Sequence, residues 1–453
     1  MRTILLILCT LLAAAQTPAP ATPATPADNM DFCAFRNGHW WDGKQFVQRT
    51  MYSVKGELHP NPLPVPFKAE QVDLQGGYVI PACAEAHNHA ATADHPEATD
   101  RFIAAGILYA KNPANIPGVR VGSNVNTPEG VDIIFSNGTF TAPEGHPLVL
   151  VKRGGIKVAD SEGGFYYTID SIADLDAKFP RFLATKPDFV KVILVYSEEY
   201  EKRKFRPEYG TPAPGSPDWG RNDPYFSRRG LNPAFLKPIV DRARKAGLAV
   251  VAHVESAADF HVAVDAGVNE INHMPGFWPT DESIASGDFA KYRIAEADAR
   301  NAARRGITVV STLHGALGIV SKMVAAKAAG EKAGTTAGAA GYNEKSKPLL
   351  DVYRANIELL RKHGVKLLMG SDEFRKSSRD EVLSLADYHL LSNSELLTSW
   401  CELTPQSLFP KRKIGKLRDG FEANFVVLKN DPLADIKAIT NVQMVYKHGK
   451  RLK

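Results

Sequence analysis

The middle of the chain repeats one arrangement of hydrophobic and polar positions. An amphipathic stretch of helical periodicity ends in a glycine, and a β-branched apolar run follows and ends in a polar residue. Four copies stand out, RARKAGLAVVAHV, AVDAGVNEINHM, AARRGITVVSTL and LRKHGVKLLMGSD, with a fainter one in FIAAGILYAKN. Their glycines, Gly247, Gly267, Gly306 and Gly364, take the place after a helix where a left-handed residue is favoured. The pattern predicts helices that alternate with strands.

Local signals support the starts of these helices. Asn232 and Pro233 form a cap followed by a first-turn proline, and Ser256 with Asp259 resembles a capping box. Strands that alternate with helices form βαβ units and a parallel sheet. We therefore predict an α/β fold, a (β/α)8 TIM barrel over residues 77–417, in which the strand ends open onto one face. An open doubly wound sheet is the alternative, although no GxGxxG follows an early strand.

The two ends of the chain resemble each other more than they resemble the middle. Residues 31–76 consist of short apolar and aromatic segments broken by turn signals, which predict a few short antiparallel strands. Residues 418–453 have the same character, with an apolar strand at Phe425 to Leu428 and a turn near Gly449. We expect both ends to pair into one small accessory β-sandwich domain.

The first 30 residues are predicted to form a targeting segment and a linker, with no folded core of their own. Arg2, the apolar run from Ile4 to Leu12 and the alanines after it predict a signal peptide at residues 1–15. Residues 16–30 are a linker rich in proline, alanine and threonine. Because the apolar run is shorter than the ~20 residues that span a bilayer, the mature chain is expected to be exported, periplasmic or secreted, with no membrane segment.

Composition and charge exclude some partners and leave others open. The 453 residues are 44% hydrophobic and 23% charged, as in an ordinary globular protein, and a net charge of +5 implies no nucleic-acid partner. A homo-oligomer is possible. Outside the predicted signal peptide the cysteines are Cys33, Cys83 and Cys401, too few for a disulfide-stapled domain, although one disulfide stays open.

Polar residues at the predicted strand ends are candidates for a metal site. His87 and His89 lie one residue apart after an apolar run, and this spacing points both rings to the same side of a strand. An isolated HxH pair also occurs on protein surfaces. His253 and His273 each fall six positions after a helix-ending glycine, and Asp372 follows another strand. Four histidines and one aspartate at a barrel mouth suit Zn²⁺.

Lys191 lies within the apolar strand DFVKVILVY. An unpaired ammonium group there would be costly to remove from water, so the lysine needs a compensating partner. An ordinary explanation is a side chain that extends to the barrel rim or pairs with a carboxylate.

Several motifs, in this order, resemble the amidohydrolase superfamily: VIPACAEAHNHA, NHM, GSD and GKLRDGFEANFVVLKNDPLADI. The resemblance implies a distorted (β/α)8 barrel with two divalent metal ions, which the donor types suggest are Zn²⁺. One metal would be held by His87, His89 and Asp372 and the other by His253 and His273, with Lys191, carboxylated by carbon dioxide, as the bridge. The DFVK strand is similar to that of exported dipeptidases and related amide hydrolases.

The resemblance implies hydrolysis of an amide or related C–N bond in a small molecule such as an N-acyl amino acid, a dipeptide or a cyclic amide. A metal-bridging hydroxide would attack, and Asp372 would act as general base and then general acid. Lactone, ester or phosphotriester hydrolysis could use the same site. A mononuclear deaminase would need an acid where Ser256 stands, one residue after Glu255. A non-catalytic scaffold should lack some ligands, and none is missing.

Other features bear on the substrate. The sequence departs from the family pattern at four positions, and none of these departures removes a predicted metal ligand. The positions are Cys83, Ala84, Glu85 and Glu373. His314 is a candidate for contact with the substrate or for a place behind the ligands. The segments 197–230 and 315–347 could form a carboxylate pocket and a lid, or a solvated loop and a linker.

Overall fold

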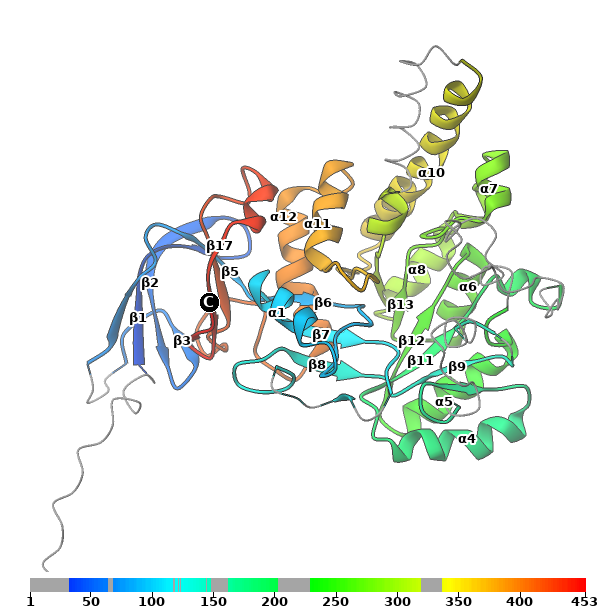
Figure 1. Ribbon diagram of the computed structural model, residues 1–453, viewed down its shortest axis with the longest axis horizontal. Helices are drawn as coiled ribbons and strands as arrows, with labels where there is room; N and C mark the ends of the chain where they lie inside the picture. The colour runs from blue at the N-terminus through cyan, green and yellow to red at the C-terminus, as the bar shows by residue number, and fades with distance from the viewer. Residues whose placement is uncertain are drawn as a thin grey trace, which may run out of the picture.

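A computed structural model describes residues 32–63, 68–116, 119–120, 122, 124–143, 145–147, 162–202, 229–318 and 336–453 (Figure 1). The predicted signal peptide and linker lie outside the described residues, as do residues 203–228 and 319–335 of the two substrate segments. In the described part of the chain, no helix is long and apolar enough to cross a membrane.

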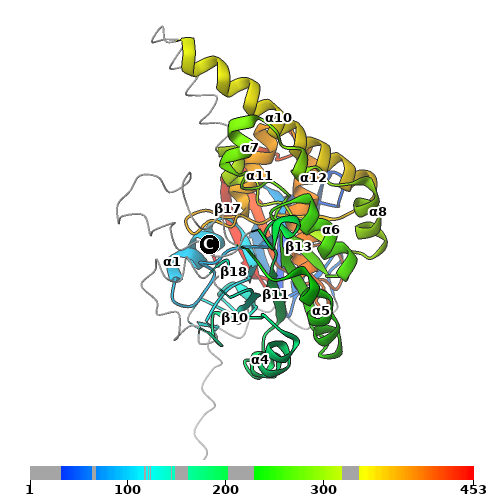
Figure 2. The same ribbon diagram turned by 90° about the vertical axis from the view of Figure 1, so that its right-hand side faces the viewer.

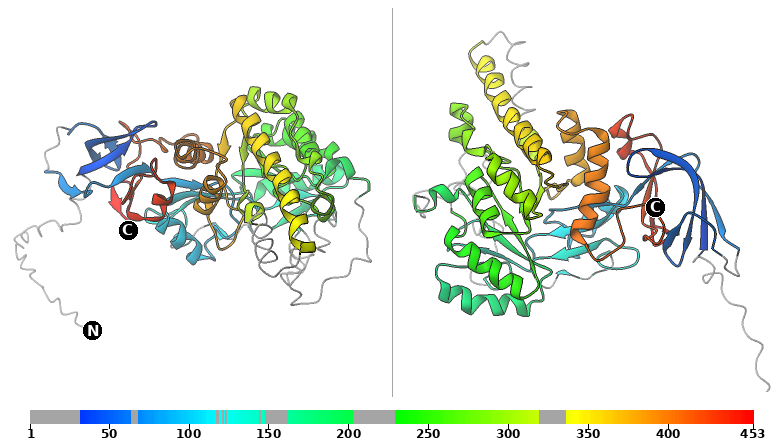
Figure 3. Two further views of the ribbon diagram at one scale, coloured as in Figure 1. Left: turned by 90° about the horizontal axis from the view of Figure 1, so that it is seen from above. Right: turned by 180° about the vertical axis from the view of Figure 1, so that it is seen from behind.

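Strands from both ends of the chain share one mixed sheet, which lies at one end of the molecule (Figures 1 and 3). Its order is β18-β17-β16-β5-β1-β2-β3, with β4 also on β1. The strands are β1 (Phe32–Trp41), β2 (Phe46–Val54), β3 (Glu57–His59), β4 (Glu70–Asp73), β5 (Tyr78–Pro81), β16 (Phe425–Leu428), β17 (Val442–Lys447) and β18 (Lys450–Arg451).

The pairing within this sheet differs in one respect from the expected short antiparallel strands. β1 is ten residues long, and β4 and β5 run parallel to it. A register shift between Phe35 and Gly38 divides β1 into two halves. β4 pairs with the first half and β5 with the second. The single long strand β1 therefore pairs with two strands along the same edge.

The middle of the chain forms two parallel sheets. One has the order β6-β7-β8 and the other β10-β9-β11-β12-β13-β14-β15. The strands are β6 (Cys83–Glu85), β7 (Ile107–Asn112), β8 (Asp132–Phe135), β9 (Thr139–Thr141), β10 (Tyr166–Thr168), β11 (Phe189–Ile193), β12 (Ala249–His253), β13 (Glu270–Asn272), β14 (Thr308–Val310) and β15 (Leu367–Leu368).

Backbone hydrogen bonds join the two parallel sheets at both sides. Ala86 N, just after β6, donates to Met369 O, just after β15, at 2.9 Å. Asp188 N, just before β11, donates to Phe135 O of β8 at 2.9 Å. The arrangement is a TIM-barrel-like α/β fold, so the predicted α/β class and the parallel strands are confirmed.

Helices cover the parallel strands (Figure 2). α5 packs on β12 and α6, and α8 packs on α6 and α10. The helices are α1 (Pro96–Ala104), α4 (Ile172–Ala184), α5 (Leu236–Lys245), α6 (Ala257–Ala266), α7 (Asp281–Ser286), α8 (Glu296–Arg304), α10 (Thr336–Lys362), α11 (Ser378–Asp387), α12 (Asn393–Leu397) and α13 (Thr404–Leu408). A π-helix, η6 (Thr398–Leu403), joins α12 to α13.

The predicted helix signals are confirmed. The side chain of Ser256 accepts a hydrogen bond from Asp259 N in a complete capping box, and the side chain of Asn232 accepts one from Ala234 N. The four repeat glycines all have φ between 68° and 80°, the left-handed conformation that lets the chain turn from a helix into the next strand.

Candidate metal centre

Two predicted ligands at the end of β6 face a third at the end of β15. His87 Nε2 lies 3.3 Å from His89 Nε2 and 3.3 Å from Asp372 Oδ1, and His89 Nε2 lies 3.2 Å from Asp372 Oδ1. Donors bound tetrahedrally at about 2.1 Å lie about 3.4 Å from one another. The three donor atoms thus have the spacing expected of ligands that share one metal ion.

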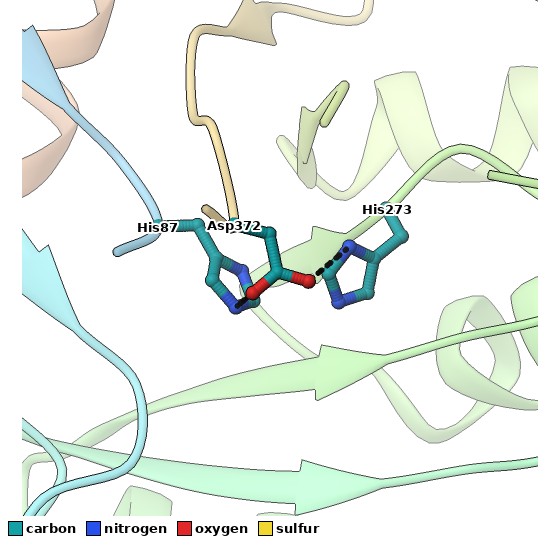
Figure 4. A group of neighbouring side chains, drawn as sticks. All are labelled: His87, His273 and Asp372. Atoms are coloured by element: carbon teal, nitrogen blue, oxygen red, sulfur yellow. Dashed lines mark ion pairs between the residues drawn. The ribbon is translucent and has the colours of Figure 1, made fainter. Parts of the chain in front are cut away.

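His273, at the end of β13, lies on the other side of the same carboxylate (Figure 4). Its Nδ1 is 4.0 Å from Asp372 Oδ2 and 2.7 Å from the hydroxyl of Thr312. When Nδ1 carries the ring hydrogen and donates it to the Thr312 hydroxyl, the Nε2 lone pair is available to a metal. Within the described part of the chain, His273 Nε2 and His87 Nδ1 are buried and have no hydrogen-bond partner. The ring of His253, from β12, lies 4.5 Å from that of His273.

The protonation states suit metal binding, which requires neutral imidazoles and an ionised carboxylate. Burial lowers the pKa of His87 to about 3 and lowers the pKa values of His253 and His273 well below the ordinary histidine value. Burial alone would raise the pKa of Asp372, but His87 and the other histidines hold it well below the ordinary carboxyl value. Asp372 is therefore ionised while the rings of His87, His253 and His273 are neutral.

Lys191 lies within β11 and is only 2% exposed. Its Nζ donates to Asn272 Oδ1 at 2.5 Å, and Asn272 Nδ2 donates to Glu270 Oε1 at 2.6 Å. Glu270 also forms a buried ion pair with Lys111 of β7. Burial lowers the pKa of Lys191 to about 7, against the opposing influence of Asp372 and Glu270. A fraction of its amine is thus neutral near neutral pH, as reaction with carbon dioxide requires.

The comparisons with known proteins agree with this arrangement of donors. The model of the Amidohydrolase family matches residues 226–452, half of the chain. The chain belongs to the amidohydrolase family. The predicted resemblance is confirmed, and with it the chain's place among hydrolases that act on carbon–nitrogen bonds.

Solved structures share the fold of this amidohydrolase. A prolidase complexed with N-methylphosphonate-L-proline matches with a TM-score of 0.64 and 18% identity, covering 93% of this chain and 99% of its own. A Xaa-Pro dipeptidase with bound methionine has the same TM-score and coverage at 16% identity. The A. niger ochratoxinase matches with a TM-score of 0.63 and 16% identity, covering 93% of this chain and 96% of its own. No curated protein sequence matches this chain.

One residue near the site was not among the predicted ligands. His146 is buried and its ring stacks on that of His253, with centroids 5.0 Å apart. Burial lowers its pKa to about 3. His146 follows β9 by five residues, so the same search of strand ends that singled out the other histidines could have included it.

The acid that a deaminase would need is absent from the expected position. Ser256 caps α6 and donates its hydroxyl to Glu198 Oε2 at 2.9 Å. The neighbouring acid, Glu255, is buried and its Oε1 lies 2.9 Å from His253 Nε2. Glu255 therefore contacts a predicted metal ligand directly and does not stand apart from it.

Aromatic side chains flank the cluster on two sides. Phe277 stacks on His273 with ring centroids 3.9 Å apart, and Phe374, 62% exposed, lies 6.2 Å from the ring of His89. His314 turns away toward α11, where its Nδ1 lies 2.8 Å from Ser384 Oγ. Phe277 and Phe374 thus add aromatic surface beside His273 and His89.

The backbone is strained where the strands reach the site. His273 has φ 78°, Thr312 48° and Asp372 52°, all left-handed values that non-glycine residues rarely adopt. Such residues cost on the order of 1–3 kcal/mol each and concentrate at functional sites. The strain sits at the ends of β13, β14 and β15, where it sets the direction of two predicted ligands.

Proposed function

We propose that this amidohydrolase is an exported, metal-dependent enzyme that cleaves an amide or related C–N bond of a small molecule. The observation that supports it most is the set of three donor atoms of His87, His89 and Asp372, spaced 3.2–3.3 Å apart. Candidate substrates are N-acyl amino acids, dipeptides and cyclic amides. The prolidase and Xaa-Pro dipeptidase among the structural neighbours favour dipeptides in this set. Export rests on the amino-terminal sequence.

The donor set fits two divalent ions, most simply Zn²⁺. His87, His89 and Asp372 would hold one ion, His253 and His273 the other, and Lys191 would bridge them as its carbamate. The carbamate removes a buried cation and supplies two anionic oxygens, which meets the cost of burying the lysine.

In this proposal the parallel strands form one distorted, closed barrel of eight strands. β8 and β9 would be two halves of its third strand, since β8 pairs with β7 and β9 with β11. The order then places the predicted ligands after strands one, five, six and eight and Lys191 on strand four. The mixed sheet would be the accessory β domain built from both ends of the chain.

Bound divalent ions supply Lewis acidity, which makes hydroxide available near neutral pH and polarises a carbonyl group. Asp372 stays ionised, so its carboxylate can accept the proton of the attacking water and return it to the leaving nitrogen. Phe277, packed flat on His273, shields one face of that ring from water. Because one carboxylate serves both proton transfers, it must lie between the water and the leaving group.

Lys191 provides the test. Elemental analysis of the native protein should find about two divalent ions per chain. Lys191→Ala should lose metal and activity together, and a small carboxylic acid added with zinc should restore part of both, because it can fill the vacated bridge. Lys191→Arg should not be rescued, since its guanidinium fills the space and stays charged. Full metal content and near-normal turnover in Lys191→Ala would refute the bridged pair.

Two measurements test the proposed substrate class and the proposed export. A substrate panel should contain N-acyl amino acids, dipeptides that include X-Pro, and cyclic amides, with lactones and phosphotriesters as the competing class. Higher kcat/KM on the competing class would overturn the amide assignment. Amino-terminal sequencing of the extracytoplasmic protein should begin near Gln16, whereas a chain found only in the cytoplasm with Met1 intact would contradict export.

A further inference from the structure

We propose that Cys83 and Cys401 form a disulfide that joins the first parallel strand to the π-helix η6. This inference is independent of the hydrolase activity. Cys83 opens β6, and Cys401 lies within η6, 318 residues away in sequence. Both are free thiols in the structure. Their sulfur atoms lie 2.7 Å apart, farther than the ~2.05 Å of a disulfide bond but closer than two unbonded sulfur atoms normally approach.

The surroundings favour a permanent link. Both thiols are buried, Cys83 at 0% and Cys401 at 1% exposure, and β6 packs directly on η6. Burial raises the pKa of the Cys401 thiol well above its ordinary value, so the folded protein holds little of the thiolate that exchange requires. The bond would therefore form while the chain folds and then resist reduction.

Formation of the disulfide requires an oxidant, which the compartment outside the cytoplasm supplies. Two S–H bonds break and one S–S bond forms, and two protons are released. The two electrons pass to the disulfide of an exchange protein or of a small thiol compound, which is reduced to two thiols. Export would place the chain where such oxidants persist. Cys33, in β1 of the mixed sheet, would remain a free thiol.

The test uses the chain from Gln16 onward, secreted behind the expression host's own leader, so that it does not depend on residues 1–15. Alkylation after denaturation without reductant should modify one cysteine, Cys33. Digestion should yield the Cys83 and Cys401 peptides joined and lighter by two hydrogen atoms. Alkylation of all three cysteines in the secreted protein would overturn the proposal.

Thermal unfolding gives a second readout. Reductant present during the melt, when unfolding exposes the bond, should lower the unfolding midpoint of the native protein by several degrees, because the link restricts a long loop of the unfolded chain. The variant with Cys83→Ala and Cys401→Ala should not respond to reductant, and Cys33→Ala should respond as the native protein does. An equal response in the double variant would refute the link.

A different observation supports a second inference, which rests on the proposed lysine carbamate. We infer that Asn272 is a positioning residue that orients Lys191 for its role as the bridge. Asn272 is fully buried between Lys191 and Glu270, and a buried ion pair with Lys111 balances the charge of Glu270. These four side chains come from β7, β11 and β13.

The order of donors and acceptors explains the orientation. An ionised carboxylate only accepts hydrogen bonds, so Glu270 fixes the NH2 group of Asn272 toward itself. The carbonyl oxygen of Asn272 must then face Lys191, as observed. A carbamate nitrogen keeps one N–H, and its C–N bond is planar like that of a peptide. Holding that N–H on Asn272 therefore fixes the direction in which the carboxylate of the carbamate points.

Asn272→Leu tests the role, because leucine has a similar volume and cannot accept a hydrogen bond. With ¹³C-labelled bicarbonate, the native protein should show a carbamate ¹³C signal and about two metal ions. Asn272→Leu should lose the signal and much of the metal. Asn356→Leu is the matched control: Asn356 is equally buried and hydrogen-bonded, but bonds to Ile294 and Tyr292. Asn356→Leu should keep both the carbamate signal and the two metal ions.

A double variant separates positioning from a general structural role. If Asn272 acts through Lys191, the variant with Asn272→Leu and Lys191→Ala should be rescued by zinc and a small carboxylate as fully as Lys191→Ala alone. A native-like carbamate signal in Asn272→Leu, or a double variant that cannot be rescued, would overturn the positioning role. A native protein with no carbamate signal would instead overturn the bridge itself, and the positioning role with it.

Discussion

At the scale of single residues, each histidine must offer a chosen ring nitrogen to a metal. For His273, the Thr312 hydroxyl lies 2.7 Å from Nδ1 and can accept the ring hydrogen there, which leaves Nε2 for the metal. Thr312 is 3% exposed and belongs to the segment that follows β14. A partner in the segment after a neighbouring strand can therefore fix which nitrogen a ligand presents.

Replacing Thr312 should weaken the metal held by His273. Thr312→Val keeps the shape of the side chain but removes the hydroxyl, so the ring loses the partner that fixes its tautomer. We expect metal affinity to fall by roughly 10–100-fold, measured by titration with a competing chelator. Thr312→Ser retains the hydroxyl and should stay close to the native affinity. A loss of affinity in Thr312→Ser with native affinity in Thr312→Val would show that the methyl group, and not the hydroxyl, matters.

At the scale of elements, buried carboxylates attach helices to the strand ends. Glu381 of α11 is fully buried and accepts hydrogen bonds from Leu313 N at 2.9 Å and His314 N at 2.6 Å. It thereby fixes α11 to the segment after β14. Burial raises the pKa of Glu381 from 4.5 to about 7, so the folded protein holds a proton that the unfolded chain has already lost.

This shift makes stability depend on pH in a defined direction. The contribution of Glu381 is complete below about pH 4.5 and is lost as pH rises through about 7. The pKa shift of Glu381 changes the free energy of unfolding by about 3 kcal/mol in total across this pH range. Glu381→Gln cannot titrate, so its free energy of unfolding should differ from the native value by an amount that changes between pH 5 and pH 8. Urea denaturation across that range measures it, and a constant difference would show that the carboxylate stays ionised.

At the scale of the whole molecule, a buried cluster of charges joins the mixed sheet to the parallel strands. Asp132 of β8 lies 2.6 Å from Lys447 Nζ of β17 and 2.6 Å from Arg412 Nη1. Lys447 is 2% exposed. The C-terminal strand β17 is thus linked to the barrel-like middle by an ion pair, and both ends of the chain share an apolar core with it.

Removing Asp132 should destabilise the protein, because it leaves Lys447 charged and buried. For Asp132→Ala we expect a loss of about 3–5 kcal/mol in the free energy of unfolding. Asp241→Ala, which breaks an exposed pair with Lys237 on α5, should cost less than about 1 kcal/mol. Equal costs in urea denaturation would mean that Lys447 finds water when Asp132 is absent. Adding Lys447→Met to Asp132→Ala should recover part of the loss.

The sequence alone was enough to predict the fold class, the helix caps and the candidate ligands. Repeats such as RARKAGLAVVAHV carry the period of a helix, a left-handed glycine and an apolar strand, and these are local properties of the chain. The same repeat placed His253 and His273 at equivalent strand ends. Because parallel strands end on one face, local pattern and topology together were enough to nominate the site.

Other features depend on residues that are distant in the sequence and meet only in the folded chain. The parallel pairing of β4 and β5 with β1, the burial of His146 against His253 and the pairing of Cys83 with Cys401 leave no periodic signal. The partner that Lys191 needed could be expected from the cost of burying a charge. That it is Asn272, supported by Glu270 and Lys111, was decided by how three strands pack together. Local sequence determines the period and the caps of each element, whereas contacts between elements depend on packing that no single segment encodes.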